Sequence, residues 1–198
     1  MNDTADPTIV IVPGLRDHVA DHWQTLLAEC LPNVRTVPPL EHGTLSLTAR
    51  IAALDAVLDE ITGPVYLVAH SAGVLITVHW AQSATRPVRA ALLATPPDLE
   101  SALPAGYPSS EELGTNGWLP TPRRRLPFPS VVAASTNDPL ASYRCVSGMA
   151  EAWGARLVDI GEVGHLNPAA GYGPWPRGER LLAELMDTRT QTVGESPR

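Results

Sequence analysis

Six short apolar segments alternate with longer segments of helical periodicity, and this alternation restricts the fold of the 198-residue chain more than any other feature. The apolar segments do not alternate polar and apolar residues, so each is expected to be a strand covered by helices on both faces. Such strand–helix alternation is typical of right-handed βαβ units. We therefore predict an α/β fold with a doubly wound, mainly parallel six-stranded sheet flanked by helices. The predicted strands cover residues 8–14, 33–39, 64–70, 88–96, 129–138 and 155–162, and the predicted helices cover 19–31, 45–61, 72–85, 141–153 and 177–188.

The pattern favours a single domain over residues 1–198, with its core at about 8–188. Residues 97–128 interrupt it, because they are rich in proline and only weakly periodic around Ser109 to Leu113. An insertion of this length beside a sheet is typically either a cap or lid over a site or an irregular surface loop, and the sequence leaves both open. The polar residues 189–198 are expected to form a disordered tail.

Charge and composition exclude several classes of partner. The formal net charge is −7, which argues against nucleic acid as a ligand. No apolar run approaches the ~18 residues of a membrane span, and the acidic first residues lack a secretory pattern. Cys30 and Cys145 belong to no metal-binding or redox motif and are expected to be reduced, small core residues. We therefore expect a cytoplasmic protein of bacterial type with no membrane partner.

Residues 67–73, LVAHSAG, carry a second strong signal. Ala69 and Gly73 lie two residues before and after Ser71, and small residues at these positions allow the sharp strand-to-helix turn called a nucleophile elbow. Alanine occupies the first position, where glycine is usual. The motif predicts Ser71 as a nucleophile; the alternative is that Ser71 only caps the following helix.

A serine nucleophile needs a base within hydrogen-bond reach and an acid that orients the base. In this kind of sheet the order along the chain is serine, acid, histidine, each after a strand. Asp138 follows the fifth predicted strand and His165 follows the sixth, so both are expected at the carboxyl edge with Ser71. Asp98, after the fourth strand, is the alternative acid.

An oxyanion hole is predicted from two backbone N–H groups. One belongs to Ala72, at the start of the helix after the elbow, and the other to Leu15, in the Pro13-Gly14-Leu15 turn after the first strand. The alternative for the second is an ordinary Pro-Gly turn.

The remaining histidines receive weaker assignments. His70 is expected to project away from the reaction centre, and His79 to be a core or surface residue. His18 and His22 have a spacing that permits metal binding, but no third ligand is evident, and His22 is expected to pack the first helix. His42 either lines the pocket or is exposed.

These motifs together resemble the small serine hydrolases related to retinoblastoma-binding protein 9, members of the α/β-hydrolase superfamily. The resemblance implies Ser71 as nucleophile, Asp138 as acid and His165 as base, with no metal or organic cofactor. It is carried by IVIVPGL (9–15), HWQ (22–24), LVAHSAG (67–73), NDP (137–139) and AEAWGARLVDIGEVGHLNPAAGYGPWPRG (150–178).

The sequence also departs from these relatives. His18 stands where relatives usually carry a serine, and residues 38–48 lack the Asp-Trp pair and the later Trp that relatives often show. The shape of the substrate pocket is therefore the property that is least safely inferred for this chain from those relatives.

The expected activity is hydrolysis of a carboxylic ester, or of an amide or thioester, through a Ser71-acyl intermediate. The expected partner is a small-molecule ester or acyl substrate, and no motif indicates a protein partner. One alternative is a non-catalytic or weakly catalytic protein-binding member of the same fold. Acyl transfer would use the same residues. The natural substrate and the oligomeric state are not encoded in any motif.

Overall fold

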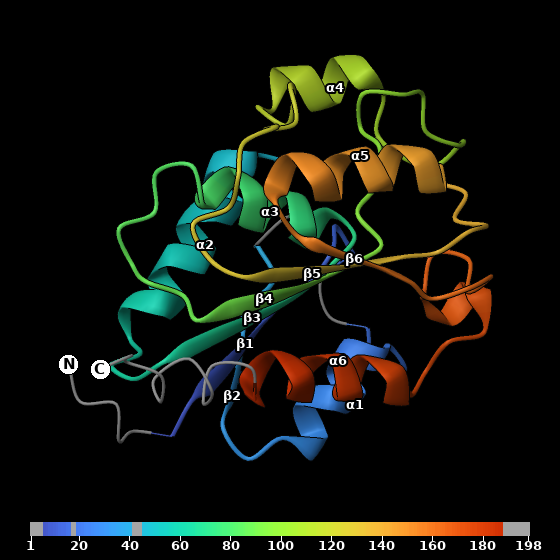
Figure 1. Ribbon diagram of the computed structural model, residues 1–198. Helices are drawn as coiled ribbons and strands as arrows, with labels where there is room; N and C mark the ends of the chain where they lie inside the picture. Colours follow the sequence, from blue (N-terminus) through green and yellow to red (C-terminus); the bar gives the residue numbers. More distant parts are fainter. Residues whose placement is uncertain (1–5, 17–18, 41–44, 188–198) are drawn as a thin grey trace, which may run out of the picture.

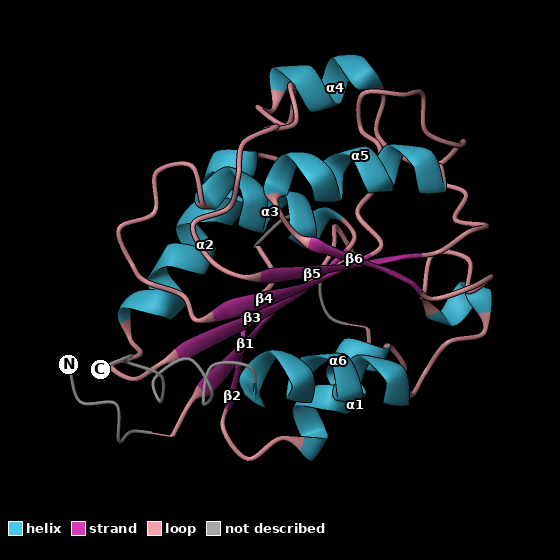
Figure 2. Ribbon diagram, in the orientation of Figure 1, coloured by secondary structure: helices cyan, strands magenta, loops and turns pink. Residues whose placement is uncertain are grey.

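One sheet of six parallel strands forms the centre of the computed structural model, which describes residues 6–16, 19–40 and 45–187 (Figures 1 and 2). This confirms the predicted fold class, and the observed strand pairs are all parallel rather than mainly so. The order is β2-β1-β3-β4-β5-β6, so the chain reverses its direction of travel across the sheet between β1 and β3. The strands are β1 (Thr8–Val12), β2 (Val34–Thr36), β3 (Val65–His70), β4 (Ala90–Ala94), β5 (Ser130–Ala134) and β6 (Arg156–Asp159).

Helices cover both faces of the sheet (Figure 2). One face packs against α1 (Trp23–Cys30) and α6 (Pro176–Asp187), and the other against α2 (Leu47–Asp59), α3 (Ala72–Trp80) and α5 (Tyr143–Trp153). The four central strands are buried along their whole length, which explains why their sequences show no polar–apolar alternation. The core is therefore two apolar layers, one on each side of the sheet.

Most of the observed elements are shorter than the predicted ones, and the last helix has the predicted length but begins one residue earlier, at Pro176. The predicted strand 33–39 pairs as a strand only over Val34–Thr36, since Pro38 and Pro39 have no N–H groups to donate. The first helix begins at Trp23 rather than at residue 19 because His22 caps it. The prediction of two core cysteines is wrong: Cys30 is exposed as the last residue of α1, and Cys145 is only half-buried in α5.

The insertion 97–128 contains a helix, α4 (Ser110–Thr115), where weak periodicity was expected. A capping box between Ser109 and Glu112 begins this helix, which lies over α5 in Figure 1. Two tryptophans fasten the later part of the insertion: Trp118 donates its indole N–H to the carbonyl of Leu45 (2.6 Å), and Trp153 donates to that of Pro122 (2.8 Å). This part of the insertion is thereby tied to the helical layer that includes α5.

The expected tail, residues 189–198, and the histidines His18 and His42 lie outside the described residues. Within the ranges given above, none of the helices is both long enough and apolar enough to cross a membrane.

Candidate active site

The turn at Ser71 has the strained backbone that the motif predicts. Ser71 adopts φ 56° and ψ −127° directly after β3 and before α3, a conformation that residues with a side chain rarely adopt. Its side chain makes no helix-capping hydrogen bond, so the alternative of a simple N-cap is wrong. Thr95 after β4 and Leu166 after His165 also have positive φ, at 44° and 48°. Among the described residues other than glycine, a positive φ therefore occurs at three positions, all of them after strands of the sheet.

Gly73 makes the close approach of α3 to β1 possible. A Cβ atom at this position would lie 2.1 Å from the carbonyl oxygen of Val12 and 2.6 Å from that of Pro13. Both obstacles are backbone atoms, which cannot rotate away as a flexible side chain would. The glycine of the elbow motif is thus required by helix–strand packing.

Gly73→Ala is expected to lower the free energy of unfolding by about 3 kcal/mol, since the added methyl group must displace the backbone after β1. Denaturant titration would measure the loss. Gly148→Ala is the matched control, because a Cβ there meets nothing within 4 Å in the exposed part of α5, where alanine favours the helix. Equal stability of Gly73→Ala and the unaltered protein would contradict this account.

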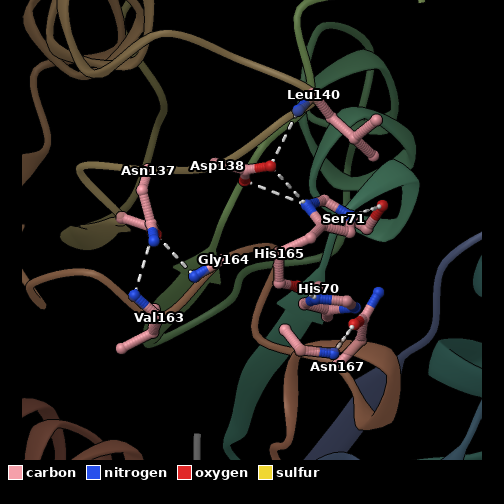
Figure 3. A network of polar contacts seen from close by, with 11 residues as sticks. His70, Ser71, Asn137, Asp138, Leu140, Val163, Gly164, His165 and Asn167 are labelled. Carbon is pink, nitrogen blue, oxygen red and sulfur yellow. Dashed lines mark hydrogen bonds and ion pairs between the residues drawn. The ribbon is translucent and has the colours of Figure 1, made fainter. Parts of the chain in front are cut away.

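The three side chains predicted from the sequence meet in one hydrogen-bonded line (Figure 3). His165 Nε2 lies 2.8 Å from Ser71 Oγ, and His165 Nδ1 lies 2.9 Å from Asp138 Oδ2. The His165 and Asp138 side chains are 6% and 1% exposed, so the pair is shielded from water. Asp98, the alternative acid, instead accepts hydrogen bonds from Ser101 and from the backbone N–H of Glu100.

Two polar residues before Asp138 hold the loop that carries His165, and the sequence analysis missed both. Asn137 Oδ1 accepts from the backbone N–H of Gly164 (2.7 Å), and Ser135 Oγ accepts from that of Val163 (3.3 Å). Ser135 also donates to Asn137 (3.0 Å). The only sequence signal is that both lie in the polar run STND, which ends at Asp138.

The expectation that His70 points away from the reaction centre is wrong. Its ring lies against His165, with ring centroids 5.0 Å apart, and His22 packs against it at 4.6 Å. Residues at alternate positions of β3 face α1 and α6, and His70 belongs to that set with Tyr66. The segment after β6 leads to α6 and brings His165 to the same face.

Burial keeps His22 and His70 neutral. It lowers the pKa of His22 to about 4 and the pKa of His70 well below its ordinary value, and the neighbouring His165 acts in the same direction. His22 also packs the first helix as expected, because its Nδ1 accepts from the backbone N–H of Gln24 (3.2 Å) and so caps α1. In the part of the chain that the structure describes, no three His, Cys, Asp or Glu side chains gather as a metal site.

A cavity of about 150 Å³ opens beside Ser71. Leu15 and Ala72, the predicted oxyanion donors, both line it, and the loop after β1 passes so close that a Cβ on Gly14 would lie 3.2 Å from Ser71 Cβ. Part of its wall comes from the insertion, which contributes Pro97, Leu99, Leu103 and Tyr107. The other lining residues are Gly14, Arg16, Val19, His22, Gln24, His70, Leu140, His165, Asn167, Pro168 and Ala169.

A parallel sheet with this strand order, and with a serine on a strained turn after β3, is the fold of the α/β-hydrolase superfamily. Within that superfamily the chain belongs to the serine hydrolase family, whose model matches residues 9–184. The narrower resemblance to relatives of retinoblastoma-binding protein 9 is carried by the sequence motifs alone.

Solved structures give the same fold. A protein from Pectobacterium atrosepticum, named as a YdeN-like hydrolase, is 31% identical with a TM-score of 0.79, over 92% of this chain and 91% of that one. The ydeN gene product of B. subtilis is 16% identical with a TM-score of 0.68, over 92% and 100%. Est1E from Butyrivibrio proteoclasticus, with ferulic acid bound, is 13% identical with a TM-score of 0.70, over 98% and 92%. No curated protein matches the sequence.

Proposed function

We propose that this serine hydrolase cleaves carboxylic esters through an acyl intermediate on Ser71. The observation that carries the proposal is the continuous hydrogen-bonded line from Ser71 Oγ through both ring nitrogens of His165 to Asp138. A hydroxyl group is a weak nucleophile, and this arrangement supplies both the base and the group that orients it.

The proposed reaction has two halves. Ser71 Oγ attacks the ester carbonyl carbon while its proton passes to His165 Nε2, and the tetrahedral intermediate then expels the alcohol, which takes the proton back from His165. Water attacks the acyl-enzyme in the same way, with His165 again as base, and releases the acid and free Ser71. Asp138 holds the proton on His165 Nδ1 throughout, which leaves Nε2 able to accept.

The backbone N–H groups of Leu15 and Ala72 are proposed to stabilise the negative oxygen of the intermediate. Both residues line the cavity at Ser71, and Ala72 is the first residue of α3, where the helix dipole is positive. Each donor of this kind contributes about 3 kcal/mol to transition-state stabilisation.

The cavity favours a compact apolar acyl group. The surface of its wall is mostly apolar, with Val19, Leu99 and Leu140 among the residues that line it, and its volume is about 150 Å³. An apolar cavity of that size accommodates a molecule of roughly six carbon atoms. We therefore propose short to medium acyl chains as substrates. An amide or thioester with such an acyl group would use the same residues.

The test is a series of p-nitrophenyl esters from acetate to laurate, together with labelling by a fluorophosphonate probe. We expect covalent labelling, and a kcat/KM that peaks near four to six acyl carbons and falls about tenfold or more by laurate. Matched p-nitroanilides and thioesters would rank the three bond types.

Each outcome has a separate meaning. An optimum at laurate would contradict the acyl-size proposal but not the esterase activity. A folded protein that neither reacts with the probe nor turns over any of these substrates would contradict the proposed function and favour the non-catalytic, protein-binding alternative.

A further inference from the structure

His70 makes a buried hydrogen bond to the main chain of His165. Its Nε2 lies 2.9 Å from the carbonyl oxygen of His165, and only 5% of His70 is exposed (Figure 3). A carbonyl oxygen accepts and never donates, so His70 must carry its proton on Nε2. His70 is also the last residue of β3, immediately before Ser71.

We propose that His70 is a positioning residue for the catalytic base. Its hydrogen bond fixes the main chain of His165 in the position from which the His165 imidazole contacts Ser71 Oγ. This inference rests on the proposed function, in which His165 takes the proton of Ser71.

The segment that carries His165 needs such support. Residues 160–167 contain no helix or strand, and Leu166 has a φ of 48°. Asn137 and Ser135 fix this segment only on the side before His165, through Gly164 and Val163. Across the described ranges, His70 is the one side chain that donates to the carbonyl of His165 itself.

The bond closes a ring of contacts. Ser71 Oγ is hydrogen-bonded to the imidazole of His165, and the carbonyl of His165 accepts a hydrogen bond from His70. A peptide bond links His70 to Ser71. The nucleophile and the support of its base therefore sit on adjacent residues at the end of one buried strand. A displacement of about 1 Å at such a site is enough to cost two orders of magnitude in rate.

The chemistry of histidine suits this position. An apolar residue would leave the carbonyl of His165 buried without a partner. Burial lowers the pKa of His70 well below its ordinary value, with His165 and His22 as further causes, so the ring donates while it is neutral. A neutral ring adds no positive charge beside His165 when His165 becomes protonated during catalysis.

The test compares His70→Met with His70→Gln. Both side chains are unbranched and similar in length, but only glutamine retains an N–H near the place of Nε2. We measure kcat and KM with a short-chain p-nitrophenyl ester, per active site titrated with the fluorophosphonate, so that unfolded protein is not counted. We expect His70→Met to lower kcat about 30-fold with KM within twofold, and His70→Gln to retain at least a third of the unaltered kcat.

His79→Met is the matched control. His79, in α3, donates through Nε2 to the carbonyl of Trp118 (3.2 Å), a bond of the same type outside the site. Its loss is expected to lower the melting temperature and to leave kcat unchanged. A merely structural role for His70 would make the two methionine variants behave alike.

The inference fails if His70→Met keeps kcat within twofold, or if His70→Gln loses as much as His70→Met. If His70→Met yields no titratable protein, His70→Asn takes its place, since its amide ends one carbon short of the carbonyl of His165. Absence of turnover by the unaltered protein would instead refute the proposed function, so the two failures are distinguishable.

Discussion

Ser71→Ala is expected to lower ester turnover by about 10⁴- to 10⁶-fold and to abolish fluorophosphonate labelling. Without Ser71 Oγ there is no atom to form the acyl bond. His165 Nε2, which lies 2.8 Å from Oγ in the unaltered protein, then has no hydroxyl group to deprotonate. The fold should persist, because alanine removes only an oxygen and the backbone N–H of position 71 still donates to the carbonyl of Ala94. Initial rates and probe labelling at matched concentrations are the measurements.

Ser83→Ala provides the comparison. Ser83 is exposed after α3, and its substitution should change neither rate nor labelling. Labelling that persists in Ser71→Ala, or that disappears in Ser83→Ala, would place the reactive serine elsewhere in the chain.

Asp138→Asn is expected to lower kcat by about 10⁴-fold while the protein remains folded. The asparagine amide donates to His165 Nδ1 where the carboxylate accepts from it, so the imidazole carries its proton on Nε2 instead. A protonated Nε2 cannot accept the proton of Ser71. Position 138 can still accept from the backbone N–H of Leu140, so the local turn is retained.

Asp98→Asn separates the two candidate acids. Asp98 accepts hydrogen bonds within its own loop, from Ser101 and the backbone of Glu100, and its substitution is expected to change kcat less than threefold. A greater loss of kcat in Asp98→Asn than in Asp138→Asn would overturn the assignment of the acid. Thermal denaturation of each variant shows whether a low rate reflects unfolding.

His165, His70 and His22 lie close together, but their surroundings suit them to different roles. His165 contacts a carboxylate and a hydroxyl and has access to the cavity, which is the setting of a proton acceptor. His70 and His22 lie beside it without a carboxylate partner among the residues that the structure describes, and burial lowers the pKa of each. They are suited to donating or accepting fixed hydrogen bonds, and His165 is the one suited to proton transfer.

The insertion 97–128 has two parts with different environments. Residues of its early part, from Pro97 to Tyr107, line the cavity at Ser71. Hydrogen bonds of Trp118 and Pro122 connect its later part to the rest of the fold. A change in acyl preference should therefore follow substitution of Leu103, which lies in the early part, more readily than substitution within α4.

The sequence by itself determined the fold class and indicated which residues, placed after successive strands, would meet at the site. Unbroken apolar runs predict covered parallel strands, and parallel strands bring their carboxyl ends to one edge, so residues 71, 138 and 165 could be grouped from position alone. The elbow motif also predicted a small residue at position 73, although the backbone that excludes a larger one, at Val12 and Pro13, belongs to a distant segment.

Only the tertiary structure determined which other residues contact Ser71, Asp138 and His165. The position of His70 depends on which face of β3 meets the segment leading to α6, and the roles of Ser135 and Asn137 depend on where that segment passes. The cavity wall joins residues near positions 15, 100, 140 and 168, which no spacing along the chain relates. Periodicity and motifs act over a few residues, whereas these contacts arise from the packing of distant segments against one another.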